Sequence, residues 1–135
     1  MQVDLSRARE RLEVARRDLE GATTLARIQE IVRRAVREMV GADGATFVLR
    51  EDDQCYYVDE DAIGPLWKGR RFPMQVCISG WAMINKRAAV VPIRSEAPIG
   101  AVGSYWSYDH TASADEIRLL QALADASSVA MLRVG

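Results

Sequence analysis

The feature that most constrains the fold is a change of hydrophobic period close to Gly41. From Leu25 to Val40 the apolar residues recur at helical spacing in a wide stripe, which is typical of a helix that faces a core. Thr23 or Thr24 can cap the start of this helix, Gly41 ends it, and a strand of β-formers follows at 45–50. A polar loop at 51–54 and a returning strand at 55–58 complete a hairpin. The sequence therefore predicts a core-facing helix joined directly to a β-hairpin.

Residues 4–20 also have the pattern of a helix, in which Leu5, Leu12 and Leu19 repeat every seven residues. Alanines three positions after each leucine complete a narrow a/d seam, and the other faces are crowded with Arg and Glu. This narrow stripe favours dimerisation through a short coiled coil. The alternative is a helix that packs on its own domain.

The stretch 69–83 lies between the hairpin and the remaining strands. It begins as a basic loop stiffened by Phe72-Pro73, and Ser79 is the predicted N-cap of a short helix that runs to Lys86. Its aromatic and sulfur-containing side chains suit the wall of a small-molecule pocket, although such residues also commonly fill a core. A run at 88–93 and a central strand at 99–106 follow. Gly100 and Gly103 in this strand suggest a close approach of backbone or ligand, or a bulge.

The last predicted helix runs from about Ala114 to Leu132. Ser113 is its N-cap, and Glu116 three residues later completes a capping box. Its apolar stripe is broad enough to face both a sheet and a neighbouring helix.

Composition excludes several classes of function. A chain of 135 residues with 49% hydrophobic and 27% charged residues is typical of one soluble globular domain. Eighteen basic and nineteen acidic side chains leave a net charge of −1, which gives no electrostatic case for binding nucleic acid. Two cysteines fit a reducing cytosol, the charged N-terminus predicts no signal peptide, and no apolar run is long enough for a bilayer. A cytoplasmic location is therefore expected.

No residue pattern predicts catalysis or a metal site. The acids at 59–61 are expected in a solvated turn, because no histidine supports a metal site there. The lone His110 beside Asp109 forms no relay with a nucleophile. A basic edge made by Lys68, Arg70 and Arg71 is either solvated or a clamp for an anion.

Several stretches resemble the GAF domains of bacterial sensor histidine kinases, over about residues 23–132. They are Gly41-Ala-Asp-Gly-Ala-Thr-Phe-Val-Leu-Arg50, Cys55-Tyr-Tyr-Val-Asp-Glu-Asp61, Pro65-Leu-Trp-Lys68, Phe72-Pro-Met74, Cys77-Ile-Ser-Gly-Trp-Ala-Met83 and Ile99-Gly-Ala-Val-Gly103. The resemblance implies an α+β fold with a GAF/PAS-like antiparallel sheet, helices on both faces, and N- and C-terminal helices that form a dimer bundle. Residues 1–22 would be an N-terminal signalling helix and residues 23–135 the sensory domain.

The function implied by this resemblance is that of a non-catalytic sensory domain in a two-component signalling protein, without the kinase or cyclase that produces the output. The domain would bind a small molecule of unknown identity or relay a signal through a homodimer. The implied pocket lies between the sheet and residues 66–84. Its expected lining is Phe47, Tyr57, Trp67, Phe72, Met74, Cys77, Trp81 and Tyr105. The expected dimer interface is Leu5, Leu12, Leu19, Leu120 and Met131.

The sequence departs from the GAF pattern between Val91 and Pro92, where family members carry a pocket lid. Either the chain is shortened here or residues are missing from this sequence. The motifs for cyclic nucleotides and for bilin attachment are incomplete. Two alternatives remain: a structural dimerisation module with a vestigial pocket, and an enzyme similar to free methionine-R-sulfoxide reductases that uses Cys77. For the enzyme, the partner cysteine would lie in the absent segment, and Cys55 is a poor substitute.

Overall fold

The computed structural model describes residues 4–62, 68–73, 91–93, 98–106 and 112–134. The described helices are α1 (Leu5–Gly21), α2 (Leu25–Val40) and α4 (Ala114–Val134). The described strands are β1 (Gly44–Glu51), β2 (Gln54–Ala62), β3 (Arg71–Pro73), β4 (Val91–Ile93) and β5 (Gly100–Tyr105).

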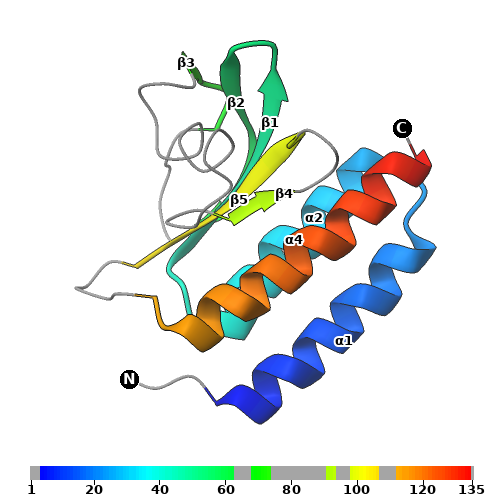
Figure 1. Cartoon of the computed structure of the whole chain (residues 1–135), viewed down its shortest axis with the longest axis vertical. Helices are drawn as coiled ribbons and strands as arrows, with labels where there is room; N and C mark the ends of the chain where they lie inside the picture. The colour runs from blue at the N-terminus through cyan, green and yellow to red at the C-terminus, as the bar shows by residue number, and fades with distance from the viewer. Residues whose placement is uncertain (1–3, 63–67, 74–90, 94–97, 107–111, 135) are drawn as a thin grey trace.

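The strands form one antiparallel sheet in the order β3-β2-β1-β5-β4, with β1 at its centre (Figure 1). A bulge between Phe47 and Val48 shifts the register of β1 against β2. Pro92 has no backbone N–H and lies in the edge strand β4, where one side of the strand needs no partner. The expected α+β fold with an antiparallel sheet is confirmed. β4 runs directly through the Val91-Pro92 junction.

The helices are stacked in two layers on one side of the sheet (Figure 1). α2 and α4 contact the strands, and α1 packs on the outer side of α2 and α4. The short helix expected at 79–86 lies outside the described residues, so the helices described here cover one face of the sheet.

The caps expected from the sequence fix three helix ends. The side chain of Thr24 accepts a hydrogen bond from the Arg27 backbone N–H at 3.2 Å, and Gly41 adopts the left-handed conformation (φ 64°) that ends α2. Ser113 and Glu116 exchange hydrogen bonds of 3.0 and 3.1 Å as a capping box at the start of α4.

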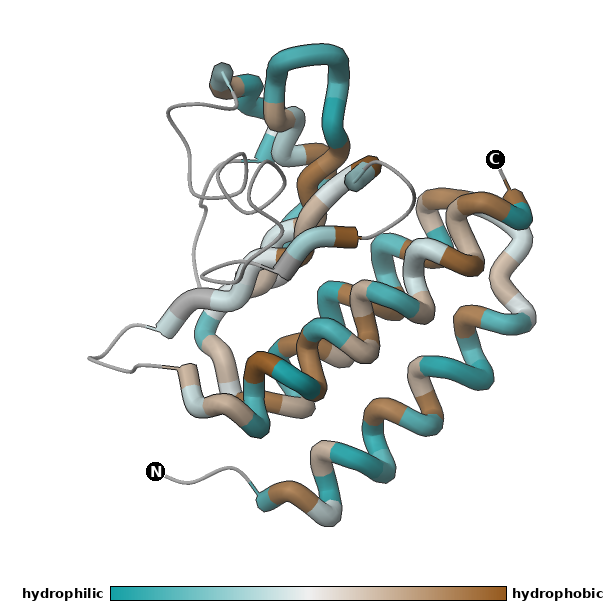
Figure 2. Tube along the Cα trace, in the orientation of Figure 1, coloured by the Kyte–Doolittle hydropathy of each residue, from teal (hydrophilic) through white to brown (hydrophobic). Residues whose placement is uncertain are grey.

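The main core fills the space between the helices and the helix-facing side of the sheet, and the tube in Figure 2 shows hydrophobic residues recurring along all three helices. Phe47 of β1, Ile93 of β4 and Val102 of β5 belong to this core. They pack with the inner residues of α2 and α4. Burial of this apolar surface is the main force that holds the layers together.

The leucine seam of α1 is covered by the chain itself. Leu12 and Leu19 are only 6% and 1% exposed, because they pack against α2 and α4, and Leu120 of α4 is 4% exposed. Leu5 and Met131 are half-buried. α1 therefore packs on its own domain, as the alternative to a coiled coil predicted. Its buried leucines are not a free surface for a second copy.

Two predictions from the sequence were wrong. β2 extends through the three acids at 59–61, which were expected in a solvated turn, and β3 lies where the basic loop stiffened by Phe72-Pro73 was expected. Asp59 is buried in the strand because Arg33 of α2 forms an ion pair with its carboxylate. A partner 26 residues away thus overrides the local preference of acids for turns.

The last turn of α4 is tied to the end of α1. One nitrogen of the Arg133 guanidinium, Nη2, donates to the backbone oxygens of Leu19 and Ala22, at 2.7 and 2.8 Å. These carbonyls lie at the C-terminal end of α1, where a cation is favoured by the helix dipole. The contact joins the first and last helices of the described chain.

Gly100 of β5 is needed for the close approach of two strands. A Cβ atom built at this position would overlap the backbone oxygen of Val48. The close backbone approach expected at the glycines of this strand is confirmed at Gly100.

Among the described residues, no helix combines the length and apolar character that a bilayer crossing requires.

Candidate functional site

The side of the sheet that points away from the helices carries a second group of buried residues. In β1, Ala45 and Phe47 face the helices, so Thr46 and Val48 point to the other side. Val48 pairs with Tyr57 of β2 and with Ala101 of β5, which places these residues on the same side. We call this group the distal patch: Thr46, Val48, Cys55, Tyr57, Phe72 and Ala101.

The distal patch is sheltered from water and its six side chains are uncharged. Five of them are at most 4% exposed, and Phe72 is half-buried. Charged residues stand at the two ends of the patch. Arg50 is exposed toward the hairpin loop, and half-buried Glu60 pairs with Thr46 across the strands. The patch is therefore a buried apolar layer with a guanidinium at one end and a carboxylate at the other.

Thr46 places an unpaired hydroxyl in this apolar surface. The residue is 1% exposed, and its Oγ1 atom has no hydrogen-bond partner among the described residues. A buried hydroxyl without a partner costs roughly 1–3 kcal/mol, so native proteins keep few such groups. An atom supplied from outside the chain would remove this cost.

Two aromatic rings lie at the β3 side of the patch. The Tyr57 and Phe72 rings meet edge to face, with centroids 5.5 Å apart and planes at 87°. The Tyr57 backbone N–H donates to the Arg70 oxygen at 3.0 Å, and its oxygen accepts from Gly69 at 2.7 Å. These bonds hold residues 69 and 70 beside β2.

The bulge in the β1–β2 pair separates neighbouring acids onto opposite faces. Asp59 pairs with Phe47 and faces the helices, where it binds Arg33. Its other oxygen lies 3.6 Å from the Lys68 ammonium, and Glu60 Oε1 accepts from the Lys68 backbone N–H at 2.7 Å. β2 therefore contacts the distal patch on one side and α2 on the other.

The expected lining residues are only partly brought together. Tyr57 and Phe72 are in contact on the distal patch, whereas Phe47 belongs to the helix-side core and is removed from the expected lining. The position of Phe47 follows from strand alternation, which sends it to the face opposite Thr46. Of Tyr105, the structure describes the backbone, which pairs with Gly44. The remaining expected residues, Trp67, Met74, Cys77 and Trp81, lie outside the described residues.

Sequence reasoning missed Thr46, whose buried hydroxyl lacks a partner among the described residues. Its alternation with Phe47 was visible in the sequence, but nothing in the sequence shows whether a hydroxyl finds a partner. Cys55 was considered only as a weak candidate for a reactive thiol. It is fully buried, which disfavours the thiolate form that reacts.

The basic edge is engaged in local contacts. Arg71 donates from Nε to Glu51 at 2.7 Å and lies over the Tyr56 ring at 3.9 Å. The hydrogen bond to Glu51 raises the pKa of Arg71 above its ordinary value. The Arg70 guanidinium lies 5.5 Å from the Phe72 ring. The guanidinium of Arg71 is thus already held by a carboxylate, which weakens the case for an anion clamp.

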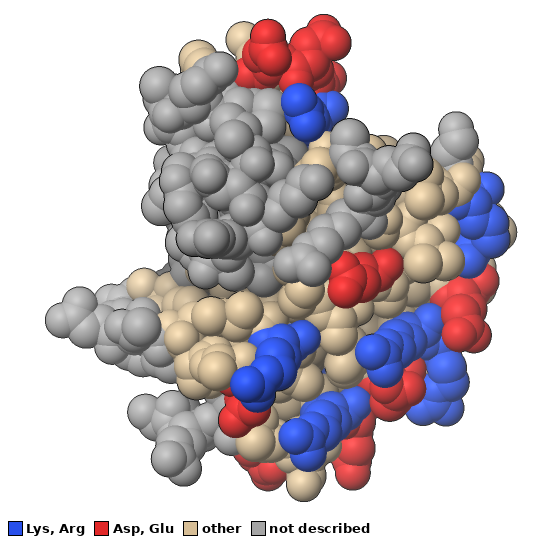
Figure 3. Space-filling view, in the orientation of Figure 1, with Lys and Arg blue, Asp and Glu red and all other residues tan. Residues whose placement is uncertain are grey.

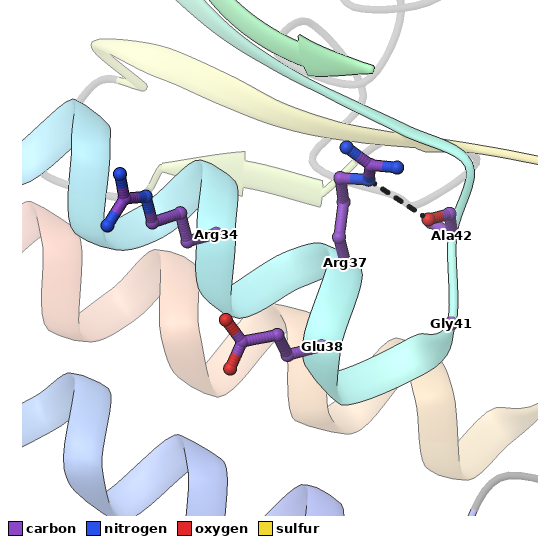
Figure 4. A pocket seen from close by; sticks show the side chains of 5 residues that line it. All are labelled: Arg34, Arg37, Glu38, Gly41 and Ala42. Atoms are coloured by element: carbon purple, nitrogen blue, oxygen red, sulfur yellow. Dashed lines mark hydrogen bonds between the residues drawn. The ribbon is translucent and has the colours of Figure 1, made fainter. Parts of the chain in front are cut away.

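A hollow lies on the helix surface, away from the distal patch. It has a volume of about 320 Å³, is open to solvent, and is lined by Arg34, Arg37, Glu38, Gly41 and Ala42 (Figure 4). Arg37 turns toward the strand and donates to the Ala42 oxygen at 3.3 Å. Glu38 is paired with Arg11 of α1. These polar groups already serve the structure, so the hollow is a weaker candidate than the distal patch.

The face seen in Figure 3 carries both signs of charge over the helices. The helices carry neighbouring ion pairs, such as Arg118 with Asp115 at 3.0 Å and Arg27 with Glu30 at 2.8 Å. Exposed pairs of this kind add little to stability. Because positive and negative side chains are intermixed, the face shown has no broad region of positive electrostatic potential.

Solved structures share this fold at low sequence identity. A free methionine-R-sulfoxide reductase from Neisseria meningitidis, in complex with its substrate, is 16% identical, with a TM-score of 0.84 over 99% of this chain and 93% of that chain. The GAF domain of an Acinetobacter phosphoenolpyruvate-protein phosphotransferase is 10% identical, with a TM-score of 0.84 over 98% and 95%. The GAF-B domain of DevS from Mycobacterium smegmatis is 18% identical, with a TM-score of 0.70 over 80% and 93%.

No family model matches the sequence, and the comparison with curated proteins gave no match. The structures that share the fold include both GAF domains and free methionine-R-sulfoxide reductases. The fold alone therefore does not separate a sensor from an enzyme.

Proposed function

Because the chain has the GAF fold, we propose that it is a non-catalytic sensory domain of a cytoplasmic signal-transduction protein, which binds a small molecule at the distal patch. The observation that carries the proposal is the unpaired Thr46 hydroxyl in a sheltered apolar surface. Ligand sites are mostly apolar with a small number of polar groups that fix orientation. Thr46 is such a group, and Tyr57 and Phe72 supply the aromatic wall.

The proposed signal passes from the sheet to the helices through β2. A ligand that moves Tyr57 also moves Asp59 two residues later, and Asp59 is bound to Arg33 of α2. α2 and α4 together support α1, and Arg133 fixes the end of α1 to α4. Binding would shift the population between two arrangements of these helices.

A homodimer through the terminal helices remains part of the proposal, with a changed interface. The buried leucines of α1 are replaced by Val129 and Leu132 of α4, which are 66% and 65% exposed. Such side chains on the last turns of α4 are available to a second copy. In this proposal the attached output module is a histidine kinase, which the movement of the terminal helices would regulate.

The proposed function is tested by native mass spectrometry of the purified protein and by thermal unfolding in the presence of heat-extracted small molecules from the expression host. Bound mass that is lost on denaturation, together with a raised Tm, supports binding, because a ligand of the folded state alone stabilises it. A bare chain whose Tm is unchanged by the extract would contradict the proposal.

The reductase alternative is supported by the fold shared with the Neisseria meningitidis enzyme. Cys55 is a poor nucleophile because it is buried, which leaves Cys77 as the candidate thiol. Turnover of free methionine-R-sulfoxide by the wild type, lost in Cys77→Ser and retained in Cys55→Ser, would replace the sensory proposal with the enzymatic one.

A further inference from the structure

We infer that the ligand of the distal patch is an uncharged, ring-containing molecule with one group that hydrogen-bonds to Thr46. The inference rests on the proposed function and adds the chemical class of the ligand. It follows from the charge of the patch, from the position of its unpaired hydroxyl, and from the two rings at its edge.

The charges around the patch disfavour an anion. The six side chains of the patch are neutral, and the charged group that pairs across the strands with Thr46 is the carboxylate of Glu60. A buried anion beside this carboxylate would lose its hydration and face a like charge. The described cations around the patch are less suitable. Arg50 at its other end is exposed and donates from Nε to the Asp52 oxygen at 3.2 Å, Lys68 lies 3.6 Å from Asp59, and Arg70 is exposed over the Phe72 ring.

The hydrogen-bonding capacity of the patch is concentrated at Thr46. Cys55 and Tyr57 each already take part in an interaction, whereas Thr46 Oγ1 has no partner among the described residues. A hydroxyl can both donate and accept, so it can serve an alcohol, a phenol, an amide or a ring N–H. One polar group on the ligand is enough to satisfy it.

The remaining contacts favour a ring. Val48 and Ala101 pair across the adjacent strands β1 and β5 and are fully buried, so this part of the patch is purely apolar. Tyr57 and Phe72 meet edge to face at one side, an arrangement that a further aromatic ring can extend. Fused or single rings with one polar substituent fit these surfaces better than flexible chains, because less conformational entropy is lost on binding.

The test uses three probes with the same ring: phenol, benzene and benzoate. Phenol is neutral at pH 7 and can hydrogen-bond, benzene cannot hydrogen-bond, and benzoate is an anion. Binding to the full chain is followed by the NMR signals of the backbone amides of Thr46, Val48, Tyr57 and Ala101. Phenol is expected to shift these signals with a Kd about five- to tenfold lower than that of benzene, and benzoate to bind most weakly.

Two variants assign the hydrogen bond. In Thr46→Val, phenol is expected to bind no better than benzene, while benzene binding is unchanged. Thr24→Val is the matched control, because its hydroxyl already serves as the N-cap of α2, and it is expected to leave all three affinities unchanged. Equal affinity of phenol for wild type and Thr46→Val would overturn the role of Thr46.

The outcomes separate the ligand class from the proposed function. If benzoate shifts the distal amides most strongly, the patch binds ligands and the inferred class is wrong. If none of the probes shifts these amides up to the solubility limit, the patch is a closed core, and both the class and the proposed function are overturned.

Discussion

Replacing Thr46 with valine is expected to stabilise the unliganded protein, although it removes a polar group from a buried strand position. Valine has nearly the shape of threonine and suits a strand equally well. The substitution replaces the unpaired hydroxyl by a methyl group in an apolar surface. Most buried substitutions destabilise, so the expected sign is unusual.

The size of the effect follows from the cost of a buried hydroxyl that lacks a partner. This cost is about 1–3 kcal/mol in unfolding free energy. For 135 residues the unfolding entropy is about 0.28 kcal/mol per kelvin, so Tm is expected to rise by about 4–10 °C.

The assay is urea unfolding, with thermal unfolding as a second measure, on protein freed of small molecules by refolding. The midpoint should rise while the slope m stays constant, because the surface exposed on unfolding hardly changes. An unchanged or lower midpoint would refute the reasoning, since it would show that the Thr46 hydroxyl is already satisfied.

Thr24→Val is the control with the opposite sign. Its hydroxyl accepts from the Arg27 backbone N–H, so its loss removes the N-cap of α2. The expected cost is about 1 kcal/mol, or roughly 3–4 °C in Tm. Opposite shifts at two threonines would show that the partner, and not the residue type, decides the sign.

Three further predictions concern the fold and the helices. Gly100→Ala should lower the free energy of unfolding, measured in urea, by about 2–4 kcal/mol, because the new Cβ overlaps the backbone oxygen of Val48. A variant as stable as the wild type would contradict the close approach of the two strands. Leu12→Glu should unfold the domain, as measured by circular dichroism, because Leu12 is 6% exposed and the substitution buries a charge. Leu132→Glu should remain folded, because Leu132 is exposed, and light scattering should then show a dimer converted to a monomer. Arg133→Gln should lower stability by about 1–3 kcal/mol and speed amide exchange in α1, and unchanged exchange would show that the contact does not hold α1.

Local signals in the sequence predicted the helix ends well. Thr24, Gly41, and the pair Ser113 and Glu116 act on the backbone within three or four residues, so their roles can be inferred without the fold. The hairpin and the α+β class followed from periodicity for the same reason. β2 was cut short because the partner of Asp59 is on a different element, which a local pattern does not contain.

The candidate site was harder to predict. A heptad repeat shows that Leu12 and Leu19 are covered but not which helix covers them, and the chain supplies that helix itself. Strand alternation shows that Phe47 and Thr46 face opposite sides but not which side meets the helices. The sequence pattern alone therefore favours the aromatic Phe47 for the pocket over Thr46, which faces the distal side.

The contact between Arg133 and the carbonyls of Leu19 and Ala22 has a consequence for the order of folding during synthesis. These residues are 114 and 111 positions apart, so the bonds form only after nearly the whole described chain has left the ribosome. Until α4 emerges, the apolar stripe of α1 has only α2 to cover it. A nascent chain that ends before α4 thus carries a partly uncovered α1, and this helix then needs protection from premature association.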